Sequence, residues 1–244
     1  MSKTGKLYGI GVGPGSPDLL TLKAVRILQE VPLVFVPRGE RGERSRALEI
    51  ISPFLRDQEV REFVAPMTRD RSALDRMWRQ AGEEVLAVLD GGKDAAFLTL
   101  GDSLLYSTYS YLLETLLRLR PGLEVETVPG IASFSAAAAL CNRALCCGQE
   151  SLAVVPATRG MGFLKEVLNT FENVVLLKVA PVFDELLALL AEVGRLDEAA
   201  YICRCGMDGQ FLLGSLAAAA EVPRDYFSLV LVGNRKGREG GHGL

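Results

Sequence analysis

The sequence LTLGDSLLYSTYSY, from Leu98 to Tyr111, joins a short apolar strand to an amphipathic segment with helical spacing. Between them stands Gly101-Asp102-Ser103. We expect bare backbone, one carboxylate and the free N–H groups of a helix start to meet there. Ligands of open parallel α/β sheets bind at such carboxyl ends of strands. The stretch therefore predicts an α/β fold with a ligand site, although a loop in which Asp102 or Ser103 only caps the helix has the same pattern.

Tyrosines follow this loop on the predicted helix. Tyr106 and Tyr109 are three positions apart and are expected to share a helix face, whereas Tyr111 is not on that face. Tyr106 is nearest to the Gly-Asp loop, so it is the tyrosine we expect to contact a ligand.

A glycine-rich turn follows the first predicted strand, Lys6–Val12. Ser16 and Pro17 then predict the start of a helix. The G-x-G-x-x-G pattern of nicotinamide-binding proteins would need glycine at Pro14 or at Ser16. The second predicted strand, Leu33–Val36, also ends without the acidic residue that holds a ribose hydroxyl. Both departures count against a nicotinamide-dependent Rossmann oxidoreductase, which is the alternative from a different functional class.

Strands and helices alternate up to Val128, and fewer helices separate the strands after it. We therefore expect an N-terminal α/β domain with a parallel sheet (1–129), a C-terminal α/β domain with a mixed sheet (130–234) and a disordered tail (235–244). The strands predicted in the second domain are Leu152–Pro156, Val174–Val179, Ala200–Cys205, Phe211–Leu213 and Phe227–Val232. The helices predicted there are Gly162–Asn169, Pro181–Val193 and Ser215–Glu221.

The composition narrows the classes of partner. The chain has 244 residues and a formal net charge of −3, so it is not built to hold a polyanion such as nucleic acid. The uncharged run Thr127–Asn142 is shorter than the roughly 20 apolar residues that span a bilayer. The N-terminus lacks the apolar core of a secretion signal, so we expect a cytoplasmic protein without membrane partners.

Cysteine and histidine usage argues against several kinds of site. The five cysteines form no C-x-x-C pattern, which gives no support for a disulfide framework or a zinc site. The single histidine, His242, stands in a glycine-rich tail. We therefore expect no protein-bound metal and no catalysis by a histidine base.

A basic loop, RGERGERSR, follows the second predicted strand. Arginine suits bidentate capture of carboxylates. A solvated loop whose charge Glu40 and Glu43 partly neutralise explains the same sequence equally well. The arginines of the loop are Arg38, Arg41, Arg44 and Arg46.

Four motifs, in order along nearly the whole chain, carry a resemblance. They are the glycine-rich start Gly9–Leu22, the run Leu98–Asp102 with Tyr106-Ser107-Thr108 after it, Val128–Ile131 before a small-residue helix, and the last strand with Tyr226–Val230. Together they resemble the signatures of the tetrapyrrole (corrin/porphyrin) methylase family. Ser103 stands where the family usually has the proline of Gly-Asp-Pro, which we expect to loosen the loop slightly.

Within that family, the sequence is similar to the enzymes that methylate C20 of precorrin-2 or cobalt-factor II in cobalamin biosynthesis. The features that carry this similarity are the Tyr-Ser-Thr-Tyr run, the Val-Pro-Arg loop and Lys178. Methylation at another ring position is the alternative within the family. The family chemistry uses S-adenosylmethionine as methyl donor and demands mainly that the substrate carbon be positioned close to the methyl group. The sequence identifies no catalytic residue and no proton acceptor.

The resemblance implies a homodimer of a class III methyltransferase, with S-adenosylmethionine in the cleft between its two α/β domains and a tetrapyrrole as substrate. Carried over by position, it implies contacts to tetrapyrrole carboxylates from the basic loop and the start of the next helix. Those residues are Arg38, Arg44 and Ser45. The cofactor site comprises Pro14, Leu100, Gly101, Asp102, Leu105, Tyr106, Ala132, Ser133, Lys178, Cys205 and Gly206.

Overall fold

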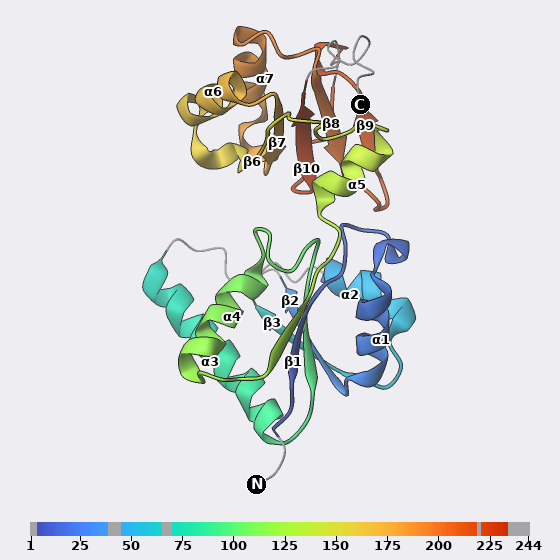
Figure 1. Cartoon of the computed structure of the whole chain (residues 1–244), viewed down its shortest axis with the longest axis vertical. Coiled ribbons are helices and arrows are strands. Elements are labelled where there is room, and N and C mark those ends of the chain that lie inside the picture. The colour runs from blue at the N-terminus through green and yellow to red at the C-terminus, as the bar shows by residue number, and fades with distance from the viewer. Residues whose placement is uncertain (1–3, 39–44, 65–69, 219–220, 234–244) are drawn as a thin grey trace. The chain divides into compact units, whose positions relative to one another are not determined.

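The computed structural model describes residues 4–38, 45–64, 70–218 and 221–233, which form two units that divide between Ala132 and Ser133 (Figure 1). Each unit has its own five-stranded sheet with helices on both faces. The first sheet is parallel and the second is mixed, which confirms the predicted fold class. The tail predicted at 235–244 and the candidate Arg44 lie outside the described residues.

The first unit contains a parallel sheet in the strand order β3-β2-β4-β1-β5. Its strands are β1 (Leu7–Gly11), β2 (Leu33–Arg38), β3 (Glu59–Val64), β4 (Ala95–Thr99) and β5 (Val125–Val128). Its helices are α1 (Leu22–Glu30), α2 (Arg46–Ile51), α3 (Arg71–Asp90) and α4 (Thr108–Leu119).

The two faces of this sheet are covered by different helix pairs (Figure 1). Alternate residues of one strand point to opposite faces. Leu98 of β4 therefore packs with α1 and α2, while the neighbouring Phe97 packs with α3 and α4. The helices that follow the adjacent strands β1 and β4 thus lie on opposite faces, and ligands of open α/β sheets bind at the carboxyl ends of strands where such a reversal occurs.

The second unit has the strand order β6-β7-β10-β8-β9, in which β6 and β7 are parallel and the other pairs are antiparallel. Its strands are β6 (Leu152–Pro156), β7 (Asn173–Leu177), β8 (Ala199–Cys203), β9 (Phe211–Leu213) and β10 (Ser228–Val232). Its helices are α5 (Ser133–Leu140), α6 (Met161–Thr170) and α7 (Phe183–Glu192).

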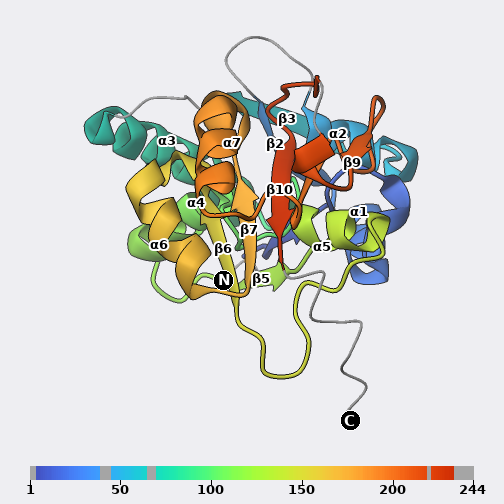
Figure 2. The ribbon, with the colours of Figure 1, turned by 90° about the horizontal axis from the view of Figure 1, so that it is seen from above.

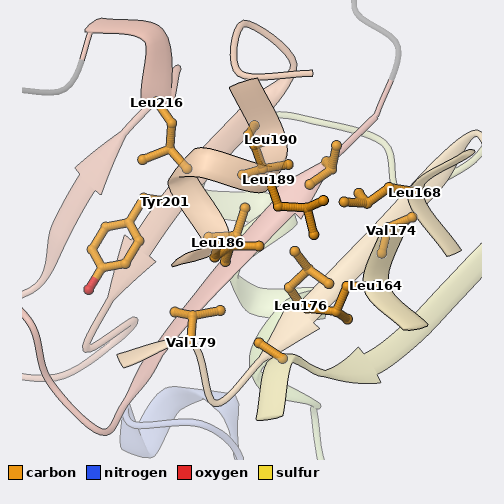
Figure 3. Packing of buried hydrophobic residues seen from close by; sticks show 14 of the residues in the cluster. Leu164, Leu168, Val174, Leu176, Val179, Leu186, Leu189, Leu190, Tyr201 and Leu216 are labelled. Atoms are coloured by element: carbon orange, nitrogen blue, oxygen red, sulfur yellow. The ribbon is translucent and has the colours of Figure 1, made fainter. Parts of the chain in front are cut away.

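Helices α6 and α7 cover one face of the second sheet and α5 covers the other (Figure 2). Leu186 of α7 and Leu164 of α6 pack with Leu176 of β7 in the larger of the two cores (Figure 3). On the opposite face, Ala137 and Ala138 of α5 pack with the sheet, where their small side chains let the helix backbone approach closely.

Two helix starts differ from the sequence prediction. Ser16 makes no capping hydrogen bond and precedes only the 3-10 turn Pro17–Leu19. Thr21 caps α1 instead, and its Oγ1 accepts a hydrogen bond of 3.1 Å from the backbone N–H of Ala24. After the Gly-Asp loop the helix begins at Thr108, so the interpretation of Asp102 or Ser103 as the cap of this helix is wrong.

Predictions in the second unit also need correction. Strand β7 ends at Leu177 rather than Val179, because Lys178 has a φ of 57° and leaves the extended conformation. The helix predicted over Ser215–Glu221 is, in its described part, a 3-10 turn over Leu216–Ala218. Within the described residues, no helix is both long and apolar enough to cross a membrane.

Candidate functional site

The loops that follow β1, β4 and β5 lie at the carboxyl edge of the first sheet. The first two loops are joined by a pair of backbone hydrogen bonds between Gly13 and Gly101. The N–H of Gly101 donates to the carbonyl oxygen of Gly13 at 2.7 Å, and the N–H of Gly13 donates to the carbonyl oxygen of Gly101 at 3.1 Å. The glycine-rich start and the Gly-Asp motif therefore form one continuous backbone surface.

Three glycines meet at this edge of the sheet: Gly11 at the end of β1, Gly101 in the loop after β4 and Gly130 in the loop after β5. A Cβ on Gly130 would lie 2.2 Å from the carbonyl oxygen of Gly101, and a Cβ on Gly11 would lie 2.7 Å from the same oxygen. Backbone atoms at these distances leave no room for a side chain. We call these three residues the glycine floor.

The Asp102 carboxylate binds two backbone N–H groups of these loops. Its Oδ2 accepts a hydrogen bond of 3.0 Å from the N–H of Gly130, and its Oδ1 accepts one of 2.9 Å from the N–H of Leu104. The carboxylate thus joins the loop after β4 to the loop after β5, and it closes the turn in which it stands.

Ser103 has a role that the sequence did not reveal. Its side chain is fully buried, and its Oγ donates a hydrogen bond of 2.5 Å to the carbonyl oxygen of Val128. The expectation that serine loosens this loop is therefore wrong, because the hydroxyl ties the loop to the end of β5. The only sequence signal for this role was the position of Ser103 next to Asp102. A sequence does not show which carbonyl a serine hydroxyl will bind.

The next three residues, Leu104, Leu105 and Tyr106, are apolar or aromatic and are 56%, 38% and 53% exposed. Tyr106 has a φ of 50°, so it does not belong to α4 and shares no helix face with Tyr109. Ser107 then ends the loop. The loop therefore presents Leu105 and Tyr106, two of the predicted cofactor contacts, at the carboxyl edge of the sheet.

Ser107 and Tyr109 hold the far end of this loop in the core. The Ser107 Oγ caps α4 by accepting from the N–H of Tyr109 at 3.0 Å, and it is 3.0 Å from the hydroxyl of buried Thr99. The Tyr109 hydroxyl lies 2.9 Å from that of Thr127, while burial raises the pKa of Tyr109. A Cβ on Gly9 would lie 2.0 Å from Cζ of the same ring. Two members of the Tyr-Ser-Thr-Tyr run therefore build the scaffold beneath the loop.

The first unit also contains the remaining N-terminal candidates. Pro14 follows Gly13 and Leu100 precedes Gly101, so each stands next to one end of the backbone bridge. Ala132 is the last residue of the unit, two positions after Gly130. Local contacts thus bring Pro14 and the residues of the Gly-Asp motif to one edge of the first sheet.

Three candidates of the second unit, Lys178, Cys205 and Gly206, follow strands that end at one edge of the second sheet. Leu177 and Ile202 both pair with Leu229 of β10, so β7 and β8 end side by side around that strand. Exposed Lys178 follows β7, and Cys205-Gly206 follow β8. Burial raises the pKa of the Cys205 thiol, which makes this thiol a poor nucleophile. Ser133 begins α5.

The residues expected to hold substrate carboxylates are only partly described. Arg38 ends β2, and its Nε lies 3.4 Å from Glu62 Oε2 on β3, so an acidic side chain already contacts it. Ser45 is buried at the N-cap of α2 and makes no capping hydrogen bond through its side chain. Across the described parts of the chain, no cluster of three or more His, Cys, Asp or Glu could hold a metal ion.

Comparison with known proteins agrees with this geometry. Residues 6–220 match the family described as Tetrapyrrole (Corrin/Porphyrin) Methylases. The chain is 35% identical to a cobalt-precorrin-2 C(20)-methyltransferase of Salmonella typhimurium, over 93% of this chain and 96% of that protein. It is 32% identical to a precorrin-2 C(20)-methyltransferase of a Sinorhizobium species, over 96% and 97% of the two chains.

The solved structures include an uroporphyrin-III C-methyltransferase of Thermus thermophilus in complex with S-adenosyl homocysteine. It has a TM-score of 0.64 and 21% sequence identity, over 94% of this chain and 97% of that one. This similarity shows the fold, and the matched family and the two relatives show the lineage. The chain belongs to the tetrapyrrole (corrin/porphyrin) methylase family.

Proposed function

We propose that this chain transfers a methyl group from S-adenosylmethionine to C20 of a precorrin-2-type tetrapyrrole in cobalamin biosynthesis. The substrate is precorrin-2 or its cobalt form, since relatives named for each are similar to this chain over nearly its whole length. The observation that carries the proposal is the glycine floor, which lies at the ligand-binding edge of a parallel sheet in a chain of this family.

The floor fits a donor of this kind. Gly11 and Gly130 let the three segments pack backbone to backbone, and a Cβ on Gly101 would meet nothing within 4 Å among the described residues, so a ligand can approach the Gly101 backbone closely. Exposed Leu105 and Tyr106 beside it offer apolar surface to a nucleoside. When bound, S-adenosylmethionine supplies a methyl group already activated on a sulfonium.

We assign the contacts to this donor as follows. Those of the first unit are Pro14, Leu100, Gly101, Asp102, Leu105, Tyr106 and Ala132, and those of the second unit are Ser133, Lys178, Cys205 and Gly206. The related fold with S-adenosyl homocysteine bound supports the class of ligand.

The task of the protein in this reaction is to position the two reactants. A conjugated tetrapyrrole supplies the carbon nucleophile, so the chain needs no nucleophile of its own. Both carboxylate oxygens of Asp102 accept hydrogen bonds from backbone N–H groups. We therefore assign Asp102 to loop positioning rather than to proton transfer. Correct placement of two reactants alone contributes roughly 7–11 kcal/mol to lowering a barrier.

The proposal also includes a homodimer and substrate carboxylate contacts from Arg38, Arg44 and Ser45. Light scattering of the purified chain measures the oligomeric state, and a mass near twice 26.4 kDa is expected.

Anaerobic turnover tests the proposed reaction. The enzyme is given S-adenosylmethionine with precorrin-2 or with cobalt-factor II, in separate reactions, and the product is analysed by mass and by NMR of a C20-labelled substrate. One added methyl at C20 in either reaction is the expected result. A methyl on another ring carbon would overturn the C20 assignment, and binding of a nicotinamide cofactor in place of S-adenosylmethionine would overturn the whole proposal.

A further inference from the structure

Ser103 holds a hydrogen bond that connects two of the loops around the glycine floor. Its side chain is 0% exposed, and its Oγ lies 2.5 Å from the carbonyl oxygen of Val128 and 3.4 Å from that of Gly9. Val128 ends β5 and is followed at once by Pro129 and Gly130. The hydroxyl therefore fixes the strand end from which Gly130 reaches the floor.

The neighbouring residue holds the other end of the same short segment. Asp102 Oδ2 accepts from the N–H of Gly130 at 3.0 Å, two residues beyond the carbonyl that Ser103 binds. Two consecutive side chains of one loop thus form hydrogen bonds with the first and the last residue of Val128–Gly130. We infer that Ser103 is a positioning residue that keeps the glycine floor assembled for the methyl donor. This inference rests on the proposed function.

The backbone at Ser103 explains how this chain departs from the Gly-Asp-Pro pattern. Among the described residues, the N–H of Ser103 makes no hydrogen bond. Proline at this position would therefore sacrifice no N–H bond, and it would fix the loop through its restricted φ. Serine leaves φ free and fixes the loop through its hydroxyl instead.

The size of the effect follows from the population of the assembled floor. Apparent affinity scales with the fraction of molecules in the binding-competent state. Removal of one buried hydrogen bond lowers that fraction, so Ser103→Ala is expected to weaken donor binding by about three- to tenfold. Once the donor is bound, the floor is assembled, and the turnover rate at saturation should stay near that of the wild type.

Calorimetric titration of the full chain with S-adenosylhomocysteine tests the inference. The variants are Ser103→Ala, Ser103→Pro and Ser52→Ala. The last is a control because Ser52, just after α2, also donates a hydrogen bond through its Oγ to a carbonyl, that of Glu49. We expect a raised Kd for Ser103→Ala, a Kd within about twofold of wild type for Ser103→Pro, and no change for Ser52→Ala. Steady-state kinetics should show a higher KM for S-adenosylmethionine with an unchanged kcat.

The outcomes separate this inference from the proposed function. A wild-type chain that does not bind S-adenosylhomocysteine overturns the proposed function. A wild-type chain that binds it, beside a Ser103→Ala variant of equal Kd, overturns the positioning role alone. If Ser103→Ala fails to fold, Ser103→Cys carries the test, because a thiol is a weaker hydrogen-bond donor than the hydroxyl, and an unchanged Kd in that folded variant contradicts the inference.

Discussion

At the scale of single residues, the site depends on three glycines. Each residue of the glycine floor lacks a Cβ, but for different reasons. Gly101 needs its φ of 74°, while a Cβ there would meet nothing within 4 Å among the described residues. Gly130 has an ordinary φ but no space. A substitution at Gly130 therefore tests the contact between the loops rather than backbone strain.

Gly130→Ala should lower the free energy of unfolding by about 1–3 kcal/mol, because its Cβ would sit 2.2 Å from a backbone oxygen that cannot move alone. Gly162→Ala is the matched control, since a Cβ there meets nothing within 4 Å in the described structure. Gly162 is in α6, so alanine should stabilise the helix by up to about 1 kcal/mol. Urea denaturation measures both changes, and equal stabilities for the two variants would contradict the packing argument.

Arg38→Ala should raise the KM for the tetrapyrrole severalfold and leave the Kd for S-adenosylhomocysteine unchanged, because the proposed contact is to substrate carboxylates only. Arg46→Ala is the control from the same stretch, since Arg46 pairs with Glu49 of its own helix at 2.6 Å. Steady-state kinetics and calorimetry give the two constants. Equal losses of substrate and donor binding in Arg38→Ala would remove Arg38 from the substrate site.

At the scale of elements, one carboxylate joins three segments of the first unit. Glu126 of β5 accepts from Lys23 of α1 at 2.5 Å and from Lys6, just before β1, at 2.7 Å. The hydrogen bonds from Lys23 and Lys6 lower the pKa of Glu126 from 4.5 to about 2. Helix α1 is thereby tied to the strand that ends at the glycine floor.

This carboxylate gives the protein a specific pH dependence. Well above pH 4.5 Glu126 is ionised in both the folded and the unfolded chain, so its stabilising effect is fully present. As pH falls from 4.5 towards 2, the unfolded chain takes up the proton first and the effect is lost. Urea denaturation at several pH values should therefore show a shallower loss of stability for Glu126→Gln than for the wild type across this window. Parallel curves would contradict the ion-pair assignment.

The elements also show what the sequence could reveal. Strands Leu152–Pro156 and Phe211–Leu213 match the prediction, because runs of apolar residues between turn residues are a local signal. The predicted start of α4 was wrong, because Tyr106 has a left-handed backbone conformation. That conformation is stabilised by the buried contacts of neighbouring residues and not by the intrinsic propensity of tyrosine. The motifs of the site could also be read from the sequence. The hydrogen bonds from Asp102 and Ser103 to Val128–Gly130 could not, because they join residues 25 or more positions apart.

At the scale of the whole molecule, each hydrophobic cluster is built from residues of one unit. The single tryptophan, Trp78, is buried in the first unit against Phe63 and near Tyr111. Its fluorescence therefore records the folding of the first unit, while far-UV circular dichroism records both units.

Leu186→Ala should destabilise the second unit by about 2–5 kcal/mol, because this leucine is fully buried among α6, β7 and β8. Urea unfolding followed by circular dichroism should begin at lower urea in this variant. The midpoint reported by Trp78 fluorescence should stay where it is in the wild type, because the packing around Trp78 is unaltered. A common shift of both signals would show that the two units unfold as one.

The contact between Gly9 and Tyr109 limits the order in which substitutions can accumulate in this lineage. A methyl group at position 9 would overlap the phenol ring, so no side chain can appear there while the ring remains. A smaller residue must first replace Tyr109, and that step empties a buried space beside Phe97. Every path through single changes therefore crosses a less stable ancestor, and the two positions should vary together or remain fixed together.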